Sequence, residues 1–220
     1  MSQRSVVCID GPSGAGKGTL ARALARELGW AYLDSGAVYR VLALRVMRRG
    51  LADDEAAAAA TDMQLRFDLD SNEVWLDGEA VASEIRNEDV GGIASRLAAR
   101  PEVREALLAF QRRFAEPEPL VADGRDMGTV VFPEAPCKIF LDASAEVRAQ
   151  RRYLELRDAG KDANFEQIFR EISARDARDR GRATAPLQAA GDALTLDCTQ
   201  LTVAEVQKAA RAHLSRAGIL

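Results

Sequence analysis

Short apolar runs alternate along the chain with longer stretches in which apolar residues recur every three or four positions. The runs are VVCID (6–10), AYLD (31–34), PLVAD (119–123), KIFLDA (138–143) and ALTLDC (193–198). Their nearly continuous apolar character is typical of strands that are buried on both faces, as in a parallel sheet. Strands that alternate with helices therefore predict an α/β fold in which helices cover both faces of a parallel sheet.

Start signals support the helical stretches. Leucines recur every four residues from Leu20 to Leu28, Pro101 suits a first helical turn, and Thr202 with Glu205 matches a capping box. We therefore expect amphipathic helices after the first apolar run, from Pro101 onward, and after the last apolar run.

The stretch MQLRFDLDSNEVWLDGEAV (63–81) departs from this alternation. Its apolar residues recur at every second position, and Asp77-Gly78 is a hairpin turn signal. This pattern predicts a three-stranded antiparallel meander, with helices on either side, in a mixed α/β insert that spans residues 62–100. The insert is too short to be a domain of its own, so we expect it to cover a substrate.

The overall composition narrows the class of partner. The chain has 220 residues, enough for one domain with a full core, and a net charge of −4 with a pI near 5.3. A general nucleic-acid-binding protein usually carries a basic surface, so this charge favours a small-molecule substrate and no nucleic acid. The self-contained core and the lack of exposed heptads predict a monomer.

Cysteine usage and the apolar runs bear on location. Cys8, Cys137 and Cys198 have no paired spacing and are expected to be buried free thiols in a reducing compartment. No run approaches the ~18 apolar residues of a membrane span, and residues 1–10 lack the pattern of a secretory leader. We therefore expect a cytoplasmic protein with no membrane partner.

The segment GPSGAGKGT nearly matches the phosphate-binding loop G-x-x-x-x-G-K-[ST]. It lies between an apolar run and an amphipathic stretch, which is the strand-loop-helix context that such a loop requires. Glycines let successive N–H groups face a phosphate, and Lys17 is expected to reach the β- and γ-phosphates of the nucleotide. The predicted donor-binding residues are Gly11, Pro12, Ser13, Gly14, Ala15, Gly16, Lys17, Gly18 and Thr19.

Gly18 occupies the position where the loop pattern has a hydroxyl that ligates Mg²⁺. The hydroxyl is displaced to Thr19, so the sequence identifies no direct protein ligand for the metal. Nucleotide oxygens and water can hold Mg²⁺ instead. A switch GTPase would also carry an N-K-x-D motif, which the sequence lacks.

Two further segments follow predicted strands. In LDSGAVYR (33–40), Ser35 lies where a strand gives way to a helix and Arg40 follows about a turn and a half later. Alone, this pattern is more typical of an N-cap serine and a surface arginine. In ADGRDMGTVVFP (122–133), Arg125 and Asp126 directly follow a strand. Because ligands of open parallel sheets bind at the carboxyl ends of strands, we expect these two residues to face an acceptor.

Arginines are dense in the last third of the chain. Many are expected on solvated helix faces, paired with aspartates such as Asp158, Asp176 and Asp179. A few are expected to close over the transferring phosphoryl group. The arginines are Arg148, Arg151, Arg152, Arg157, Arg175, Arg178, Arg180 and Arg182.

Taken together, GPSGAGKGT, LDSGAVYR, the mixed insert and DGRDMGTVVFP resemble the bacterial cytidylate kinases, nucleoside monophosphate kinases with a P-loop. The similarity runs through nearly the whole chain, including KIFLDAS and RDARDRGRATAPL. The resemblance implies one three-layer P-loop kinase domain over residues 1–220 with a five-stranded parallel sheet. It also implies a monophosphate-binding insert at 62–100 and a short lid at 151–161. The implied reaction moves the γ-phosphoryl group of ATP, with Mg²⁺, to CMP or dCMP.

The resemblance also assigns residue roles. The acceptor-binding residues that it implies are Ser35, Arg40 and Arg125 around the phosphate, Ser95, Arg104 and Asp126 near the cytosine, Arg175 and Asp179 near the pentose, and Arg182 near the phosphates. The implied catalytic residues are Lys17, Arg125 and Arg182. We see no departure from the family pattern at these positions.

The implied base contacts agree with the chemistry of cytosine. Its N4 amine donates hydrogen bonds while N3 and O2 accept them, so Asp126 can accept from N4 and Arg104 can donate to the acceptors. Uracil reverses the polarity at two of these positions and would leave buried polar groups unpaired. The scheme predicts a preference for CMP over UMP.

Two alternatives stay open on the sequence alone. One is a P-loop kinase for another small acceptor, such as a different nucleoside monophosphate or a shikimate-like alcohol. The other is a nucleotide-dependent binding or switch protein without turnover.

Overall fold

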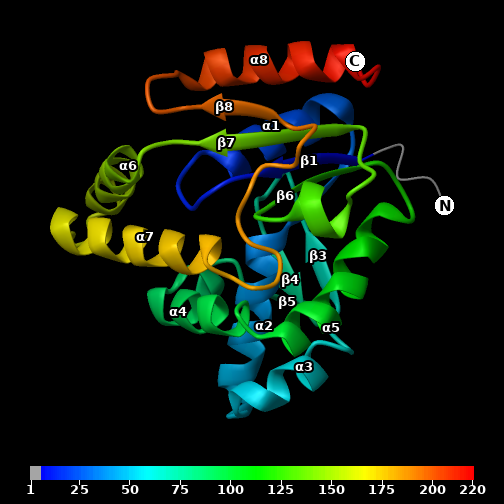
Figure 1. Cartoon of the computed structure of the whole chain (residues 1–220). Coiled ribbons are helices and arrows are strands. Elements are labelled where there is room, and N and C mark those ends of the chain that lie inside the picture. Colours follow the sequence, from blue (N-terminus) through cyan, green and yellow to red (C-terminus); the bar gives the residue numbers. More distant parts are fainter. Residues whose placement is uncertain (1–5) are drawn as a thin grey trace.

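A five-stranded sheet forms the centre of the computed structural model, which describes residues 6–220 (Figure 1). Its strands are β1 (Val6–Asp10), β2 (Ala31–Asp34), β6 (Leu120–Gly124), β7 (Cys137–Asp142) and β8 (Leu194–Asp197). They lie in the order β2-β6-β1-β7-β8, and every neighbouring pair is parallel. The five apolar runs thus form the five strands, and the predicted α/β class is confirmed. Residues 1–5 belong to the segment that lacks the pattern of a secretory leader, and they lie outside the described range.

Helices cover both faces of this sheet (Figure 1). They are α1 (Lys17–Leu28) and α8 (Val203–Arg216) on one face, with α2 (Ser35–Arg49) and α5 (Pro101–Arg112) on the other. Alternating side chains of β1 explain the two layers: Val7 and Ile9 join the core with α1 and α8, whereas Val6 and Cys8 join the core with α2. Both faces of β1 are therefore covered by helices, which gives the three-layer arrangement.

The predicted helix signals act as expected. Pro101 is the first residue of α5. At the start of α8, the N–H of Glu205 donates to Oγ1 of Thr202 at 3.3 Å, and the N–H of Thr202 donates to Oε2 of Glu205 at 2.8 Å. The capping box is confirmed. The three cysteines are buried free thiols.

The insert contains the predicted antiparallel meander. Its elements are β3 (Leu65–Phe67), β4 (Val74–Leu76), β5 (Glu79–Ala80) and α4 (Glu88–Leu97), preceded by α3 (Ala56–Ala59). The turn between β4 and β5 places Asp77 and Gly78 at φ 50° and 89°, the left-handed region that a two-residue hairpin turn needs. Short 3₁₀ turns lie at Asp53–Glu55, Glu84–Arg86 and Arg113–Ala115.

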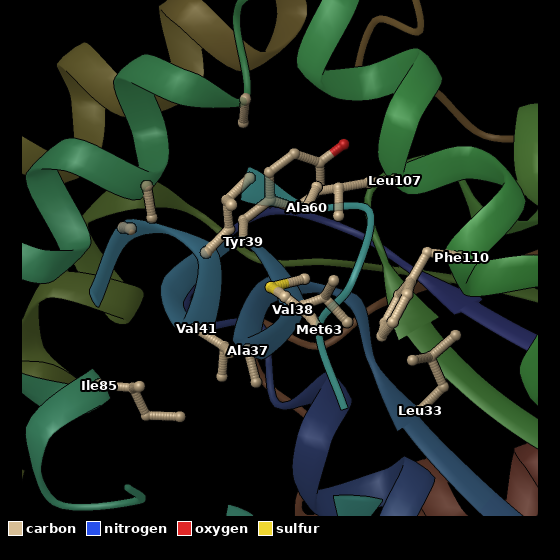
Figure 2. Close-up of a cluster of buried hydrophobic side chains, with 14 of the residues drawn as sticks. Leu33, Ala37, Val38, Tyr39, Val41, Ala60, Met63, Ile85, Leu107 and Phe110 are labelled. Carbon is tan, nitrogen blue, oxygen red and sulfur yellow. The ribbon is translucent and has the colours of Figure 1, made fainter. Parts of the chain in front are cut away.

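The insert shares its core with the main domain. Figure 2 shows Met63 and Ile85 from the insert region in one apolar cluster with Val38 of α2 and Leu107 of α5. The ring of Tyr39 lies at the edge of this cluster, with its hydroxyl directed away from Met63. The insert is therefore fastened to α2 and α5 by shared burial.

Helices α6 (Ala145–Asp158) and α7 (Phe165–Arg180) form a hairpin beside the carboxyl edge of the sheet (Figure 1). The ring centroids of Tyr153 and Phe165 lie 6.5 Å apart and join the two helices. The expected lid at 151–161 comprises the second half of α6 and the turn after it, so its first boundary falls inside a continuous helix. No helix within residues 6–220 is long and apolar enough to cross a bilayer.

Candidate active site

The P-loop links the end of β1 to the start of α1. Gly11, Gly14 and Gly16 have φ angles of 148°, 80° and 96°, and a Cβ at Gly11 would lie 2.0 Å from the carbonyl oxygen of Leu141. These positions therefore require glycine. Gly16 is the N-cap of α1 and has no side chain to bind the first N–H groups of the helix. Those groups are available to a phosphate.

Lys17, the first residue of α1, folds back over the loop. Its Nζ donates to the carbonyl oxygen of Pro12 at 2.9 Å, and only 7% of the residue is exposed. Burial and the charge of Arg125 lower the pKa of Lys17 to about 7. A phosphate at this position would add negative charge and favour the protonated form of this buried amine.

Asp123 lies next to this lysine, at the end of β6. Tyr32 Oη donates to Asp123 Oδ2 at 2.9 Å, and a Cβ at Gly18 would come within 3.3 Å of the same oxygen. Burial and the charge of Asp34 raise the pKa of Asp123. Asp123 and Tyr32 are functional candidates that no sequence motif predicted, although an acid at the end of a buried strand is a signal for such a role.

The segment after β6 turns into a single π-helical turn, Met127–Val131. Just before it, Asp126 forms an ion pair with Arg104 of α5, and their side chains are only 5% and 10% exposed. Burial raises the pKa of Asp126, while Arg104 and two other arginines oppose that shift. The guanidinium of Arg104 lies over the ring of Tyr39 at 6.0 Å from its centroid. Two of the three residues expected near the cytosine are therefore paired in a nearly dry environment.

Ser95 belongs to α4, in the insert. Its Oγ is buried and has no hydrogen-bond partner among the described residues. The carbonyl of Ala98, less than one helical turn further on, accepts from Nη1 of Arg104 at 3.3 Å. Ser95 therefore lies within one helical turn of the carbonyl that Arg104 contacts, and its place near the cytosine stays a prediction.

Asp179 of α7 is bound by two of the predicted phosphate-binding arginines. Nε of Arg125 donates to its Oδ2 at 3.0 Å, and Arg182 donates to its Oδ1. The side chain of Asp179 is 1% exposed. Burial opposes its charge, but Arg125 and Arg182 hold the pKa of Asp179 below its ordinary value. The expectation that Asp179 lies on a solvated helix face is wrong, because Arg125 reaches it from another element.

A second buried pair corrects the same expectation. Arg148 of α6 donates to both oxygens of Asp176 in α7, and these residues are 2% and 5% exposed. Nη1 of Arg148 also donates to the carbonyl of Ser13 at 3.0 Å, and a Cβ at Gly14 would lie 3.2 Å from Arg148 Cβ. The pair therefore connects both helices of the hairpin to the P-loop.

Arg175 lies between the donor and acceptor sides. Its Nη1 donates weakly to Oγ of Ser13 at 3.4 Å, and its Nε is buried without a partner among the described residues. Burial and Arg125 lower the pKa of Arg175 to about 10. Arg125, Arg175 and Arg182 thus lie around one carboxylate, that of Asp179, and this excess of positive charge favours binding of phosphate.

LDSGAVYR reaches the same edge of the sheet. The N-cap of α2 is Asp34, whose Oδ1 accepts from the N–H of Ala37 at 2.9 Å, so Ser35 is not the cap. Ser35 is buried, and a Cβ at Gly124 would lie 3.2 Å from its Cβ. Two of the predicted segments therefore touch, although they lie far apart in the sequence.

Arg40 extends from α2 to the insert. Its Nη1 donates to the carbonyl of Ile85 at 2.7 Å and to that of Asn87 at 3.3 Å. A Cβ at Gly91 would come within 2.8 Å of its guanidinium, so α4 approaches Arg40 closely. Backbone carbonyls of the insert therefore hold the guanidinium of Arg40, which could also bind an anion.

Two cavities flank these groups. One, of about 410 Å³, lies at the carboxyl ends of β7 and β8 and is lined by Ser144, Arg148 and Thr199 among others. The second, of about 320 Å³, lies between Pro101 and Arg182, where the insert meets the end of α7. The first adjoins the P-loop through Arg148, and the second adjoins the arginine cluster.

A P-loop faces buried arginines and a helical insert across the edge of a parallel sheet, and this arrangement defines a P-loop kinase of the nucleoside monophosphate kinase group. The family model described as Cytidylate kinase matches residues 7–215. The chain is 58% identical over 206 residues to the cytidylate kinase of Aeromonas salmonicida (strain A449), covering 91% of this chain and 90% of that protein. It is 55% identical over 208 residues to the cytidylate kinase of Dichelobacter nodosus (strain VCS1703A), covering 92% and 93%. The chain belongs to the cytidylate kinase family.

Proposed function

We propose that this protein transfers the γ-phosphoryl group of ATP to CMP or dCMP and releases ADP with CDP or dCDP. The observation behind the proposal is the buried Arg104–Asp126 ion pair, and the insert adds a buried hydroxyl, that of Ser95, without a partner among the described residues. A carboxylate can accept from the N4 amine of cytosine, while the guanidinium and hydroxyl can donate to N3 and O2. Family membership supports the same acceptor.

The donor phosphates would bind at the start of α1. Backbone N–H groups of the P-loop would hold the β-phosphate, and Lys17 would leave the carbonyl of Pro12 to contact the β- and γ-phosphates. The larger cavity, next to Ser144 and Thr199, has room for the nucleoside part of ATP.

The acceptor supplies its own nucleophile. A phosphate monoester has a second pKa near ~6, so an anionic oxygen of CMP can attack the γ-phosphorus without a general base. A new oxygen–phosphorus bond forms while the bond from γ-phosphorus to the β-γ bridging oxygen breaks, and ADP leaves with those electrons. Arg125, Arg175 and Arg182 would neutralise the charge that spreads over the transferring group. Ser35 and Arg40 would fix the acceptor phosphate in line.

Asp179 contacts two of these arginines. We propose that it keeps them extended toward the phosphates and that it also contacts the pentose. The 2′-hydroxyl, which CMP has and dCMP lacks, would then affect binding only through Asp179. This is compatible with the use of both substrates.

We propose that Mg²⁺ would be held through water and nucleotide oxygens. No group of three or more His, Cys, Asp and Glu side chains in residues 6–220 is arranged to hold a metal. The carboxylate of Asp123 and the hydroxyl of Thr19 are oxygen donors that could bind water of a hydrated ion. When bound with the nucleotide, the metal would supply positive charge to the β- and γ-phosphate oxygens.

The remaining proposals concern the whole molecule. We propose that the insert at 62–100 and the lid at 151–161 close over the two nucleotides, and that the protein acts as a cytoplasmic monomer. Glu88 of the insert and Arg152 of α6 form an ion pair between these two parts. Closure would therefore rearrange an existing contact.

A coupled assay of ADP release tests the proposed function. Initial rates would be compared for CMP, dCMP, UMP, AMP and shikimate at saturating ATP. We expect kcat/KM to be highest for CMP or dCMP. A preference for AMP or shikimate would contradict the cytosine assignment, and the lack of turnover with every acceptor would favour a binding or switch protein.

A further inference from the structure

Asp10 connects the P-loop to the acceptor loop, the segment at 125–131 that follows β6. It ends β1, directly before Gly11, and is 4% exposed. Its carboxylate reaches the segment after β6, where Oδ1 accepts from the N–H of Met127 and Oδ2 accepts from the N–H of Gly128, each at 2.8 Å. These two residues follow Asp126 directly. Both oxygens of one buried carboxylate therefore fix the backbone beside the base-recognition residue.

The surroundings leave this connection little freedom. A Cβ at Gly128 would lie 3.1 Å from Cδ of Lys138 and 3.4 Å from Oδ2 of Asp10. On the other side, Gly11 is pressed against the carbonyl of Leu141 in β7. The P-loop end of the connection therefore lies against the backbone of β7, and the other end lies against the side chain of Lys138 from the same strand.

We propose that Asp10 is a positioning residue that sets acceptor specificity, because it holds the Met127 and Gly128 amides and thereby aims Asp126 at the base. The inference rests on the proposed function. It assigns no contact between Asp10 and a substrate, since Asp10 acts through the backbone of the acceptor loop.

The electrostatics of Asp10 agree with such a role. Burial raises its pKa to about 6, and the two backbone N–H groups only partly offset this. The charges that face it are Asp126, which raises the pKa, and Lys17, which lowers it, with Cys8 and Lys138 also nearby. The ionised carboxylate thus costs free energy where it lies, as is common for groups that serve a site rather than overall stability.

The variant Asp10→Asn tests the proposal. Asparagine keeps the shape but has one oxygen acceptor and an NH₂ group that cannot accept from an amide. We expect the CMP-to-UMP ratio of kcat/KM to fall about tenfold, as for the loss of one hydrogen bond to a charged group. The KM for ATP should stay within about twofold, since the P-loop backbone is unaltered.

A matched control is Asp192→Asn. Asp192 pairs with Nζ of Lys138 at 2.9 Å, so it lies close to the acceptor loop but makes no contact with its amides. The control should keep the wild-type ratio. If Asp10→Asn loses stability but also keeps the wild-type ratio, Asp10 is only a structural residue. If the wild-type enzyme does not prefer CMP, the proposed function fails instead.

A wild-type measurement covers the case in which Asp10→Asn does not fold. The CMP-to-UMP ratio and the NMR resonance of the Gly128 amide would be followed from about pH 8 to about pH 5. The two acceptors carry the same phosphate, whose titration cancels in the ratio. We expect the ratio to fall with the same midpoint, near pH 6, at which the amide resonance moves. A constant ratio, a constant resonance or two different midpoints would each overturn the proposal.

Discussion

Replacing Asp126 by asparagine would remove the charge from the base-recognition pair and keep its shape. The side chains of Asp126 and Arg104 are 5% and 10% exposed, so water screens their interactions little. A hydrogen bond to a charged group contributes about 1 to 2 kcal/mol more than a neutral one, which corresponds to about 5- to 30-fold in kcat/KM for CMP. The new amide can also donate to O4 of uracil, which should raise kcat/KM for UMP. Together the CMP-to-UMP ratio should fall about 100-fold.

The assay would measure initial rates of ADP release with CMP and with UMP at saturating ATP. A fluorescent ATP analogue would show whether donor binding is unchanged. The matched control is Asp53→Asn, which removes a carboxylate from a more exposed ion pair with Arg96 in the insert region. If Asp126→Asn kept a CMP-to-UMP ratio within about twofold of the wild type, the base-recognition scheme would be refuted.

Three further changes have defined outcomes. Lys17→Ala should leave the melting temperature nearly unchanged and lower kcat by at least about 100-fold, because the ammonium that neutralises the β- and γ-phosphates is lost. Tyr32→Phe removes the hydroxyl that donates to Asp123 and should lower the free energy of unfolding by about 1 to 3 kcal/mol in urea titrations. The stability of the wild type relative to Asp10→Asn should increase as the pH falls. The pKa of Asp10 is raised from 3.8 to about 6, so the folded state binds more protons between these values. The gain should be roughly 1 to 3 kcal/mol between pH ~8 and pH ~4, and should disappear as the pH rises through ~6.

Each of these predictions has a contrary result. A kcat near that of the wild type would exclude Lys17 from phosphoryl transfer. Unaltered urea midpoints in Tyr32→Phe would mean that water replaces the hydroxyl beside Asp123. A stability difference between wild type and Asp10→Asn that does not depend on pH would mean that Asp10 titrates at its ordinary pKa in the folded protein.

The fold was largely predictable because its local signals agree with its tertiary structure. Strands buried on both faces have continuous apolar sequences, and each of the five runs became a strand to within one residue at either end. The meander was visible because its period of two differs from the helical period around it. The acceptor segments were predicted to share an edge because parallel strands end on the same side, and Ser35 does lie next to Gly124.

The buried charges were not predictable from sequence spacing. Asp179 and Arg182 are three residues apart and look like a surface pair, but Arg125 joins them from 54 residues away. Asp176 likewise pairs with Arg148 from the neighbouring helix. Helical periodicity shows which face a residue occupies, whereas the packing of one helix against another decides whether that face is dry.

A crystal structure with CMP bound would show whether Asp126 binds the base. We expect the N4 amine of cytosine to lie within hydrogen-bond distance of the Asp126 carboxylate, with the phosphate against Ser35, Arg40 and Arg125. A cytosine ring that makes no contact with Asp126, or a CMP phosphate bound away from these arginines, would contradict this expectation.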